Sequence, residues 1–542
     1  MIDLQSLPNQ GPKTVAQGSK GACSSSHPLV SETMLAIMKA GGNAMDAGIA
    51  GSLVQATVEP HMTNHGGSVI FLCYHAKTDQ YYQLSSTGTV VSGLARWSPL
   101  PKSMSTGCAA IPGYMPGLGA IYQRFGSKPW SDLCQPAIEA AQEGYPMYSW
   151  QYGVLTETMD SLTYFPSSRE LFLPNGFLTP VGQLRRNPAL AQTMQSLAQE
   201  GPAYFTHGTW AENFVKTAND LGWKIELDHM SAIPPRWHQP LSYEHEGNTV
   251  VQLAPPEQAG VLSQFLLGIL RHAGMREMGH YTKSAESLYV FAHALRWVLW
   301  EMSLLQDPEL FSVPLEQWRD DQHHQRVARI ILDSRPQVDL TEHVRLNAGK
   351  GGMQSMGLPP AETDSCELSI TDAEGNWVQL MHSGQAGGMP AVAVDGVFMH
   401  GSAANAHMQG LTGWLTGAGR IKCIVGSTIV AKDGKPWMTL GTPGRPHLTV
   451  PQVLHNILDF GMDPYEASLQ ARFWPLADDY TLEIENRIDQ EVVAGLARMG
   501  IQIKSLGTYK WNMGSFQICW QEEDGTLKGS SDPRRVGEAR AF

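Results

Sequence analysis

Apolar and polar residues follow helical spacing soon after the start of the chain. Residues 31–57 predict two helices separated by a Gly-Gly pair, because paired glycines end a helix readily. Ser31 is the expected cap of the first helix and Asn43 of the second, with Asp46 in its first turn, where the helix dipole favours an anion. The second helix, AMDAGIAGSLVQATV, is rich in small residues, so we expect it to be buried and closely packed.

Strand patterns replace the helical pattern after residue 67. SVIFLCYHA and YYQLSS predict two strands that pair through a KTDQ turn, and GNTVVQLA at 247–254 predicts another. GVLSQFLLGIL at 260–270 suits a core helix. Further helical patterns lie at 130–143, 188–200, 208–221 and 283–305.

The chain changes character at a polar, glycine-rich stretch, residues 346–364, which predicts a loop. Beyond it, strand patterns such as CELSITD and NWVQLMHS are separated by turn sequences such as DAEGN. Helical patterns return at 450–460, 464–472 and 489–499. The stretch therefore divides a larger, helix-rich part from a smaller, strand-rich one.

The composition supports a large folded protein and narrows its partners. The 542 residues are 42% hydrophobic, which is ample for a sizeable core. The net charge of −13 disfavours nucleic-acid binding, which needs a positive field. No apolar run reaches the roughly 18 residues of a membrane span, and the N-terminus lacks a signal-peptide pattern. We therefore expect no membrane partner and a cytoplasmic location.

Cysteine and histidine patterns predict neither a metal site nor a cofactor. The seven cysteines are widely spread and include no CxxC pair, so we expect reduced, mostly buried thiols. His61 and His65 lie in HMTNH, but no glutamate follows His61 as in a zincin. His323 and His324, in DDQHHQR, are expected on a solvated helix face. No GxSxG elbow indicates a serine hydrolase of the triad type.

Four polar or reactive residues, DSCE at 364–367, stand where the predicted loop meets a strand pattern. If the chain is cut before Ser365, the freed α-amino group lies beside the hydroxyl of the same residue. An α-amine has a pKa near ~8, so it can act as general base for that Oγ without a separate histidine. From these residues alone, an exposed turn is the simpler interpretation.

Several segments together resemble the γ-glutamyltranspeptidase family of N-terminal nucleophile hydrolases. The processing-site block of that family, a threonine before a strand ending in Asp-x-x-Gly-Asn, is similar to DSCELSITDAEGN, with Ser365 at the threonine position. The matches keep the order of the family and span about residues 18–475. The other matching segments are GGNAMDAGIAGSLVQATVEPHMTNHGG, IPGYMPGLGAIYQRFGSKPW, QPAIEAAQEGYPM, GSTIVAKDGKPWMTLGTPG and PQVLHNILDFGMDPYEASLQARF.

The resemblance implies an α+β fold, a four-layer αββα sandwich, and autocatalytic cleavage between Asp364 and Ser365. The implied pieces are a large subunit, 1–364, with 346–364 as its processing loop, and a small subunit, 365–542, which together form one intertwined domain. Ser365 is then both the nucleophile and, through its α-amine, the base. Serine keeps the hydroxyl of threonine but lacks the γ-methyl, which restricts χ1.

Counting along the matched blocks implies further catalytic residues. Ser383 corresponds to a family threonine that hydrogen-bonds the amine of the nucleophile, and Gln385 to an asparagine that contacts substrate. Gly444 and Arg445 correspond to paired glycines whose backbone N–H groups form the oxyanion hole. Arg445 is either a salt-bridged wall residue or a clamp on a substrate carboxylate. Cys366 is the competing nucleophile.

Most glutamate-reading groups of the family are missing or altered. Thr87 lies at or near the position of the arginine that holds the glutamate α-carboxylate. Ser402 and Asn405 lie near the positions that read the glutamyl amino group, and Cys423 replaces one of a serine pair that lines the γ-glutamyl pocket. We therefore expect a small-molecule substrate other than glutathione.

The leading hypothesis is a self-processing hydrolase that forms an acyl-enzyme on Ser365 and cleaves a small amide or acyl substrate. It is similar to family branches that act on small acyl or oxalyl groups, such as oxamate amidohydrolase. One alternative is hydrolysis of a C–C bond next to a keto or oxalyl group in a biosynthetic pathway. Another is an unprocessed, catalytically silent scaffold. The implied partners are the substrate and the protein's own two subunits, and a homodimer is left open.

Overall fold

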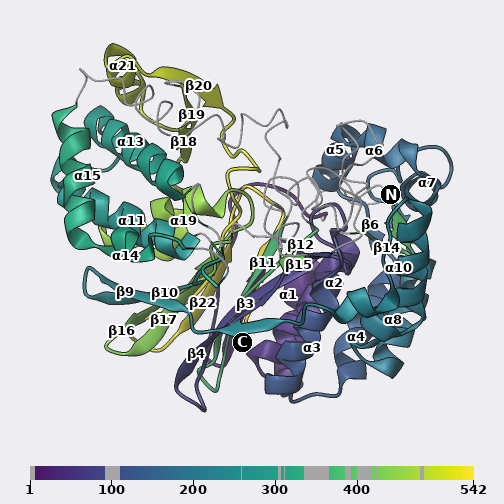
Figure 1. The fold of residues 1–542 in the computed structure, drawn as a ribbon. Coiled ribbons are helices and arrows are strands. Elements are labelled where there is room, and N and C mark those ends of the chain that lie inside the picture. The colour runs from purple at the N-terminus through teal and green to yellow at the C-terminus, as the bar shows by residue number, and fades with distance from the viewer. Residues whose placement is uncertain are drawn as a thin grey trace.

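Two seven-stranded sheets form the centre of the protein in a computed structural model (Figure 1). All strand pairs within these two sheets are antiparallel. The structure describes residues 7–91, 110–257, 259–302, 305, 307–309, 312–334, 365–384, 392–399, 418–420, 425–475 and 481–542.

Each sheet takes its strands from widely separated parts of the chain. The first sheet has the order β1 (Ala16–Gly18), β22 (Leu527–Ser531), β21 (Gln517–Gln521), β17 (Lys435–Gly441), β16 (Thr428–Lys432), β10 (Asn248–Gln252) and β9 (Leu241–His245). The second sheet has the order β23 (Glu538–Ala541), β2 (Gly21–Ser25), β11 (Cys366–Asp372), β12 (Trp377–Ser383), β3 (Ser68–His75), β4 (Gln80–Ser86) and β8 (Arg236–His238).

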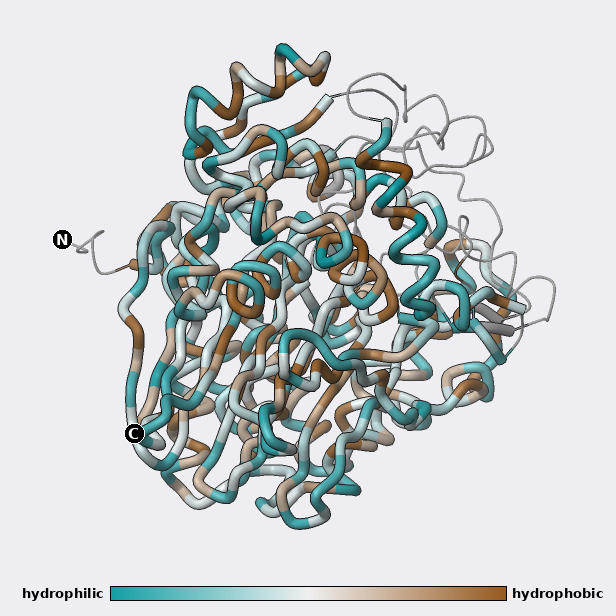
Figure 2. Tube along the Cα trace, turned by 90° about the vertical axis from the view of Figure 1, so that its left-hand side faces the viewer, coloured by the Kyte–Doolittle hydropathy of each residue, from teal (hydrophilic) through white to brown (hydrophobic). Residues whose placement is uncertain are grey.

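Helices cover the outer face of each sheet (Figure 1). Hydrophobic and hydrophilic residues are interspersed along the trace (Figure 2), and the buried hydrophobic side chains form three main layers. One core lies between the second sheet and its helices, a second between the first sheet and its helices, and a third between the two sheets. The α+β fold and the four-layer αββα sandwich expected from the sequence are therefore confirmed.

The helices divide between the two outer layers. Those on the side of the second sheet are α1 (Pro28–Lys39), α2 (Ala44–Val58), α3 (Tyr114–Phe125), α4 (Trp130–Glu143), α5 (Ser149–Glu157), α6 (Met159–Tyr164), α7 (Pro166–Phe172), α8 (Pro188–Glu200), α9 (Tyr204–His207), α10 (Thr209–Asp220) and the 3₁₀ helix Leu227–Ser231. Those on the side of the first sheet are α11 (Ala259–His272), α12 (Met275–Met278), α13 (Ala285–Met302), α14 (Leu315–Arg319), α15 (Asp321–Asp333), α19 (Pro446–Leu458), α20 (Pro464–Leu469) and α21 (Gln490–Arg498).

Shorter strands lie outside the two main sheets. They are β5 (Thr89–Val91) with β15 (Ala418–Arg420), β6 (Tyr145–Pro146) with β7 (Leu184–Arg185), β13 (Ala393–Val394) with β14 (Val397–Phe398), and β18 (Phe473–Pro475) with β19 (Thr481–Glu485) and β20 (Gln502–Leu506). Among the described helices, none combines the length and the apolar character that crossing a membrane requires.

Each main sheet mixes strands from both sides of residue 365. In the second sheet, the hairpin β11–β12 lies between β2 and β3. In the first sheet, β16 pairs with β10, and β22 pairs with β1. The N-terminal and C-terminal parts of the chain are therefore woven into the same hydrogen-bonded ladders.

The helix α2 shows how closely its layer packs on the second sheet. Asn43 and Asp46 form a capping box, in which Asn43 Oδ1 accepts from the Asp46 N–H at 2.9 Å and Asp46 accepts from the Asn43 N–H at 3.1 Å. All 15 residues of α2 are buried. The cap and the buried small-residue helix predicted from the sequence are both confirmed.

Two local predictions are wrong. The helix α1 is capped by His27, whose Nδ1 accepts from the Leu29 N–H, and Ser31 lies inside the helix. His323 and His324 are buried, because α15 packs against α11 and α13. His323 Nε2 bonds to Glu301 at 3.0 Å, so a hydrogen-bond partner offsets the burial of a polar ring.

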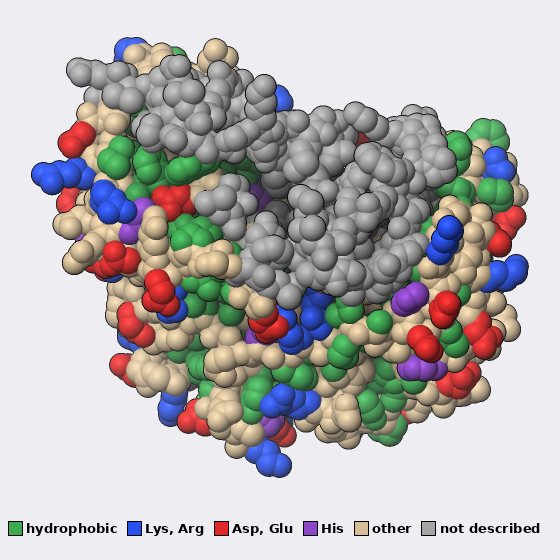
Figure 3. Space-filling model, in the orientation of Figure 1, with side chains coloured by type: hydrophobic (Ala, Val, Ile, Leu, Met, Phe, Trp, Pro, Cys, Tyr) green, Lys and Arg blue, Asp and Glu red, His purple; other side chains and the backbone are tan. Residues whose placement is uncertain are grey.

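The charges on one face of the molecule are mixed. Figure 3 shows acidic and basic side chains interspersed over the described part of that face. The net charge of −13 is therefore not gathered into a single patch there.

Gly117 in α3 permits a close contact between that helix and the second sheet. An added Cβ would overlap Val69 Cγ1 and lie 2.7 Å from Ser86 Cβ. We expect Gly117→Ala to lower the free energy of unfolding by about 1–3 kcal/mol, because overpacking displaces β3 and β4. The thermal midpoint of unfolding measures this change.

Gly153→Ala is the matched control for this helix substitution. Gly153 also lies in a helix, α5, but a Cβ added there meets nothing within 4 Å. We expect that variant to be neutral or slightly stabilised. Equal midpoints for the Gly117→Ala protein and the wild type would contradict the close packing of α3.

Candidate active site

The turn between β11 and β12 is held by its own aspartate. Asp372 Oδ1 accepts from the backbone N–H groups of Glu374 and Asn376 at 3.0 and 3.1 Å. Gly375 takes a φ of 84°, which glycine adopts without strain. Asp372 Oδ2 accepts from the Ala44 N–H at 2.7 Å, which ties the turn to the start of α2. This Asp-x-x-Gly-Asn turn therefore helps to set the register of β11 against β12.

Ser365 stands directly before β11 and meets the last residue of β12. Its Oγ donates to Ser383 Oγ at 2.9 Å. Ser365 is partly exposed, whereas Ser383 is buried. A side chain on Gly67 would overlap the Ser383 carbonyl oxygen, so the glycine in HGG allows the backbone to approach. The structure thus brings together the hydroxyls of Ser365 and Ser383. The bond of Ser383 to the amine of Ser365 stays a prediction.

Cys366 lies on the other face of β11, because successive strand residues alternate. Its Sγ donates to Glu59 Oε2 at 3.3 Å, and the residue belongs to the core beneath the helices. Burial, together with the neighbouring Glu59 carboxylate, raises the pKa of the Cys366 thiol well above its ordinary value. A thiol that stays protonated and points away from the Ser365 hydroxyl is a poor competing nucleophile. All described cysteines are free and buried, as expected: Cys23, Cys73, Cys134, Cys366 and Cys519.

Glu367 lies on the face of β11 that looks toward the first sheet. Ser427 Oγ donates to Glu367 Oε1 at 2.6 Å. Gln379, with its amide nitrogen turned toward Glu367, donates to the same oxygen at 2.9 Å. A Cβ on Gly441 would overlap this oxygen, so the end of β17 packs directly on the carboxyl group. Burial raises the pKa of Glu367 to about 8, against the opposing effect of the Ser427 hydrogen bond.

The loop after β17 carries the predicted oxyanion residues. Gly444 and Arg445 both take left-handed backbone conformations, with φ values of 68° and 55°. Arg445 is also the N-cap of α19, where backbone N–H groups and the helix dipole favour a negative charge. A left-handed non-glycine residue costs of order 1 kcal/mol and is typical of functional sites.

Two contacts link this loop to Ser365. Gly441, at the start of the loop, packs on Glu367, which lies two residues after Ser365. On the other side, a Cβ added to Gly444 would lie 3.4 Å from the Asn512 carbonyl oxygen. The ring of the neighbouring Trp511 lies beside the guanidinium of Arg535, and that guanidinium donates to the Ser365 carbonyl oxygen. The loop and Ser365 therefore lie at the same end of the sandwich.

The Arg445 side chain is buried against the protein. Its Nη1 lies 3.5 Å from Glu483 Oε2, and the guanidinium packs over the Trp474 ring. Of the two interpretations from the sequence, this geometry matches the salt-bridged wall residue.

Only some predicted substrate residues are described. Thr87 follows β4 and is buried, with a short hydroxyl at the position expected for an arginine in the family. Four other substrate-binding predictions and the residue before the predicted cut lie outside the described residues, as does the stretch 346–364. These residues are Asp364, Gln385, Ser402, Asn405 and Cys423.

Sequence reasoning missed Arg535 and Glu59. Arg535 Nη1 donates to the Ser365 carbonyl oxygen at 2.7 Å. Glu59 accepts from the Tyr148 hydroxyl at 2.8 Å as well as from Cys366. Burial raises the pKa of Glu59 to about 7, although the charge of Arg535 acts in the opposite direction. A signal was available, because Glu59 directly follows a fully buried 15-residue helix and therefore enters the core.

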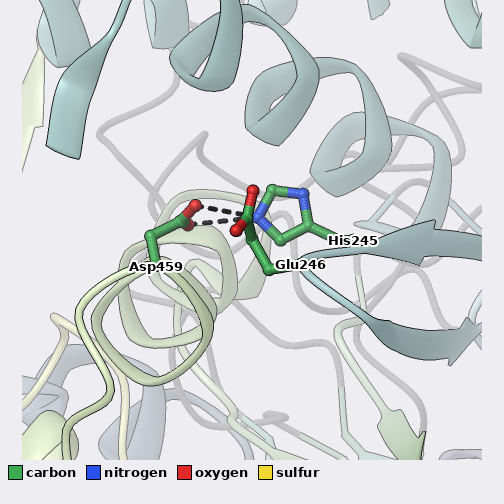
Figure 4. A group of neighbouring side chains, drawn as sticks. All are labelled: His245, Glu246 and Asp459. Carbon is green, nitrogen blue, oxygen red and sulfur yellow. Dashed lines mark hydrogen bonds and ion pairs between the residues drawn. The ribbon is translucent and has the colours of Figure 1, made fainter.

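A second polar cluster joins the β9–β10 turn to α19 (Figure 4). Ligand atoms of His245, Glu246 and Asp459 lie within 4.8 Å of one another, so they are the described residues that could hold a metal ion. Each already has a protein partner: Asp459 bonds to His245 at 3.1 Å and to His455 at 2.8 Å, and Arg276 donates to Glu246 at 2.6 Å. Despite burial, these two histidine contacts hold the pKa of Asp459 below its ordinary range. Contacts of Asp459 with His245 and His455 fasten the hairpin to the helix.

Two facing sheets covered by helices, with a hydroxyl residue at the start of a central strand, define the fold of the N-terminal nucleophile hydrolases. The family model for Gamma-glutamyltranspeptidase matches residues 30–542. The chain belongs to this family and is an enzyme of the N-terminal nucleophile hydrolase class.

Similar proteins span almost the whole chain. The glutathione hydrolase-like YwrD proenzyme of Bacillus subtilis is 26% identical over 96% of this chain and 98% of its own length. The glutathione hydrolase proenzyme of Pseudomonas aeruginosa is 27% identical over 92% and 91%. The crystal structure of cephalosporin acylase from Bacillus halodurans superposes with a TM-score of 0.82 at 21% identity, covering 100% of this chain and 99% of that one. This last likeness concerns the fold.

The raised pKa of Glu367 predicts how stability changes with pH. Between about pH 5 and pH 8 the unfolded chain releases the Glu367 proton while the folded chain keeps it, so this group lowers stability as pH rises. Glu367→Gln imitates the neutral acid. We expect the variant to gain on the order of 3 kcal/mol relative to wild type over this window, measured by urea unfolding at both ends.

Glu374→Gln serves as the control, because Glu374 is exposed in the turn that follows the same strand. That variant should keep the pH dependence of the wild type. Parallel pH dependences for wild type and Glu367→Gln would contradict a buried neutral carboxylic acid at this position.

Proposed function

We propose that this protein is a self-processing hydrolase that forms an acyl-enzyme on Ser365. The observation that carries the proposal is the 2.9 Å contact of Ser365 Oγ with Ser383 Oγ at the start of a central strand, in a chain of this family. Relatives named proenzymes support a cleavage step. The cut proposed is between Asp364 and Ser365.

Self-cleavage uses the same hydroxyl that later acts on substrate. Ser365 Oγ attacks the carbonyl carbon of Asp364, and the Oγ proton passes to the Ser365 nitrogen as the C–N bond breaks. Water then hydrolyses the resulting ester, which leaves a carboxylate on Asp364 and restores the Ser365 hydroxyl. The nitrogen becomes a free α-amine three bonds from the hydroxyl oxygen.

The two proposed subunits, 1–364 and 365–542, stay together for a structural reason. The hairpin β11–β12 of the small subunit pairs on one side with β2 and on the other with β3 of the large subunit. Separation would leave strands with unpaired backbone groups, which is costly for buried strands. The proposed cut therefore releases a chain end but no fragment.

In the proposed turnover, the Ser365 amine takes the proton from Oγ as that oxygen attacks the substrate carbonyl. The backbone N–H groups of Gly444 and Arg445 stabilise the oxyanion, aided by the N-terminus of α19. Water then releases the acyl group. The Ser383 contact supports this role, because it restrains a serine side chain that lacks the γ-methyl of threonine.

The proposed substrate is a small amide or acyl compound other than glutathione. The relatives are named glutathione hydrolases, but Thr87 replaces the arginine expected to hold a glutamate α-carboxylate. Arg445 is a weak substitute for that arginine, because its side chain already pairs with Glu483. Gln385, Ser402, Asn405 and Cys423 complete the set of proposed substrate contacts.

Substitution of Ser365 tests the nucleophile. We expect wild type to split from its 59.3 kDa chain into two pieces, and Ser365→Ala to stay whole, because the attacking oxygen is absent. Ser365→Thr should split. Denaturing electrophoresis and intact mass measurements over time check all three proteins.

Cys366→Ala is the matched control, because it changes the neighbouring residue whose thiol faces away. It should still split. Cleavage of Ser365→Ala would remove Ser365 from its role, and loss of cleavage only in Cys366→Ala would transfer that role to the thiol. A wild-type protein that remains whole would favour the silent scaffold.

The departure at Thr87 predicts weak activity on γ-glutamyl compounds. Loss of a charge-assisted contact of roughly 1.5–3 kcal/mol should lower turnover of γ-glutamyl-p-nitroanilide about 10–100-fold relative to a glutathione hydrolase. Release of p-nitroaniline measures this activity. Acetylation of Ser365 by p-nitrophenyl acetate, read by mass, confirms in the same sample that the enzyme is competent. Turnover equal to that of a glutathione hydrolase would contradict the proposed substrate class.

A further inference from the structure

Two neighbouring arginines in the loop between β22 and β23 are fully buried but differently paired. Arg534 contacts carboxylates of Glu485 and Asp532, at 2.5 and 3.1 Å. Its remaining N–H groups reach the backbone oxygens of Ser468 and Gln470. Two carboxylates therefore neutralise Arg534, which suits a purely structural role.

Arg535 has no carboxylate within ion-pair distance among the described residues. Its Nη1 donates to the Ser365 carbonyl oxygen at 2.7 Å, and its Nε and Nη2 have no hydrogen-bond partner in the described part of the chain. The guanidinium lies 5.5 and 5.6 Å from the ring centroids of Trp150 and Trp511. Indole faces attract a cation but do not neutralise it.

Burying a guanidinium costs free energy when no described carboxylate pairs with it. A role in the active site would explain why Arg535 is buried in this way. Within the described part of the chain, its hydrogen bond to a protein acceptor ends on the residue that carries the proposed nucleophile. That oxygen is three bonds from the Ser365 nitrogen. The charge is therefore held close to the group that becomes the α-amine on cleavage.

We propose that Arg535 is a positioning residue for the nucleophile. It anchors the Ser365 carbonyl, which restrains the new chain end, and it places a positive charge beside the Ser365 α-amine. The inference rests on the proposed function, since it assigns a role within that same site. A nearby cation disfavours the ammonium form of the amine, so the base is kept neutral and able to accept the Oγ proton.

Other ionisable groups around this point come from several elements. Glu59 follows α2 and interacts with the charge of Arg535, and His61 lies close enough to interact with both Arg535 and Arg185. Burial holds the pKa of His61 well below its ordinary value, so it stays neutral. Glu367, on β11, is also neutral at pH 7, because burial raises its pKa to about 8. Of these two described acids, Glu59 is thus the one whose charge opposes that of Arg535.

The experiment follows acetylation of the processed enzyme by p-nitrophenyl acetate as a function of pH. In Arg535→Met the acid limb of the rate profile should move up by about one pH unit, because loss of the cation raises the pKa of the amine. The rate at pH 7 should then fall about tenfold. Arg535→Lys keeps the charge and should keep the limb near its wild-type position.

Arg540→Met is the matched control. Arg540 lies on the adjacent strand β23 and pairs at the surface with Glu32 and Glu538. Its substitution therefore removes one positive charge, as Arg535→Met does, but away from the site. Its pH profile should match wild type. A merely structural role for Arg535 would lower the amount of folded enzyme in both Met and Lys variants without moving the limb.

Glu59→Gln provides the opposite test and does not depend on the folding of an Arg535 variant. Loss of the counterbalancing acid should strengthen the effect of Arg535 on the amine, and the acid limb should move down. An unmoved limb in Glu59→Gln, or equal profiles for wild type and Arg535→Met, would overturn the inference. If wild type neither splits nor gains an acetyl group on Ser365, the proposed function fails instead.

Discussion

The backbone ladder β2-β11-β12-β3 is the interaction on which the rest of the structure depends. The hairpin that begins at Ser365 occupies the middle of a sheet whose flanking strands come from the first 75 residues. Each central strand needs partners on both edges, because buried backbone groups must be hydrogen-bonded. Ser365 can therefore take its position only after both ends of the chain have folded together. This dependence suits an enzyme that must not react before it is complete.

Polar groups are concentrated between the sheets, near the end of the sandwich where Ser365 lies. Glu367, Ser427 and Gln379 form a hydrogen-bonded group beside Gly441, from which the loop with the predicted oxyanion residues departs. A neutral carboxylic acid can fill this space without a counter-ion, whereas a carboxylate would need one. The same cluster therefore joins the strand that follows Ser365 to the strand that leads into Gly444 and Arg445.

Local sequence patterns predicted the elements that local forces determine. The Asn43–Asp46 capping box and the β3–β4 hairpin depend on residues close together in sequence, and both were predicted. The motif around Ser365 also located its contact with Ser383, because a hairpin relates the two positions directly.

Long-range contacts were beyond sequence patterns. Arg535 lies 170 positions from the residue it contacts, and nothing in its local sequence indicates that pairing. The strand β23, EARA, has only four residues, too few for alternation to identify a strand, and its backbone pairs with the edge of β2. His323 and His324 appeared solvated for the same reason, since their burial depends on α11 and α13 packing over α15.

The interleaving of strands also limits what two molecules of this protein can share. Each main sheet contains strands from both sides of Ser365, so exchanging either part between two molecules would require a whole sheet to unfold. A defect on either side of Ser365 is consequently confined to the molecule that carries it. Two folded proteins, one defective before Ser365 and the other after it, should therefore not restore activity when they are mixed. The two parts of each polypeptide therefore fold, and function, only with each other.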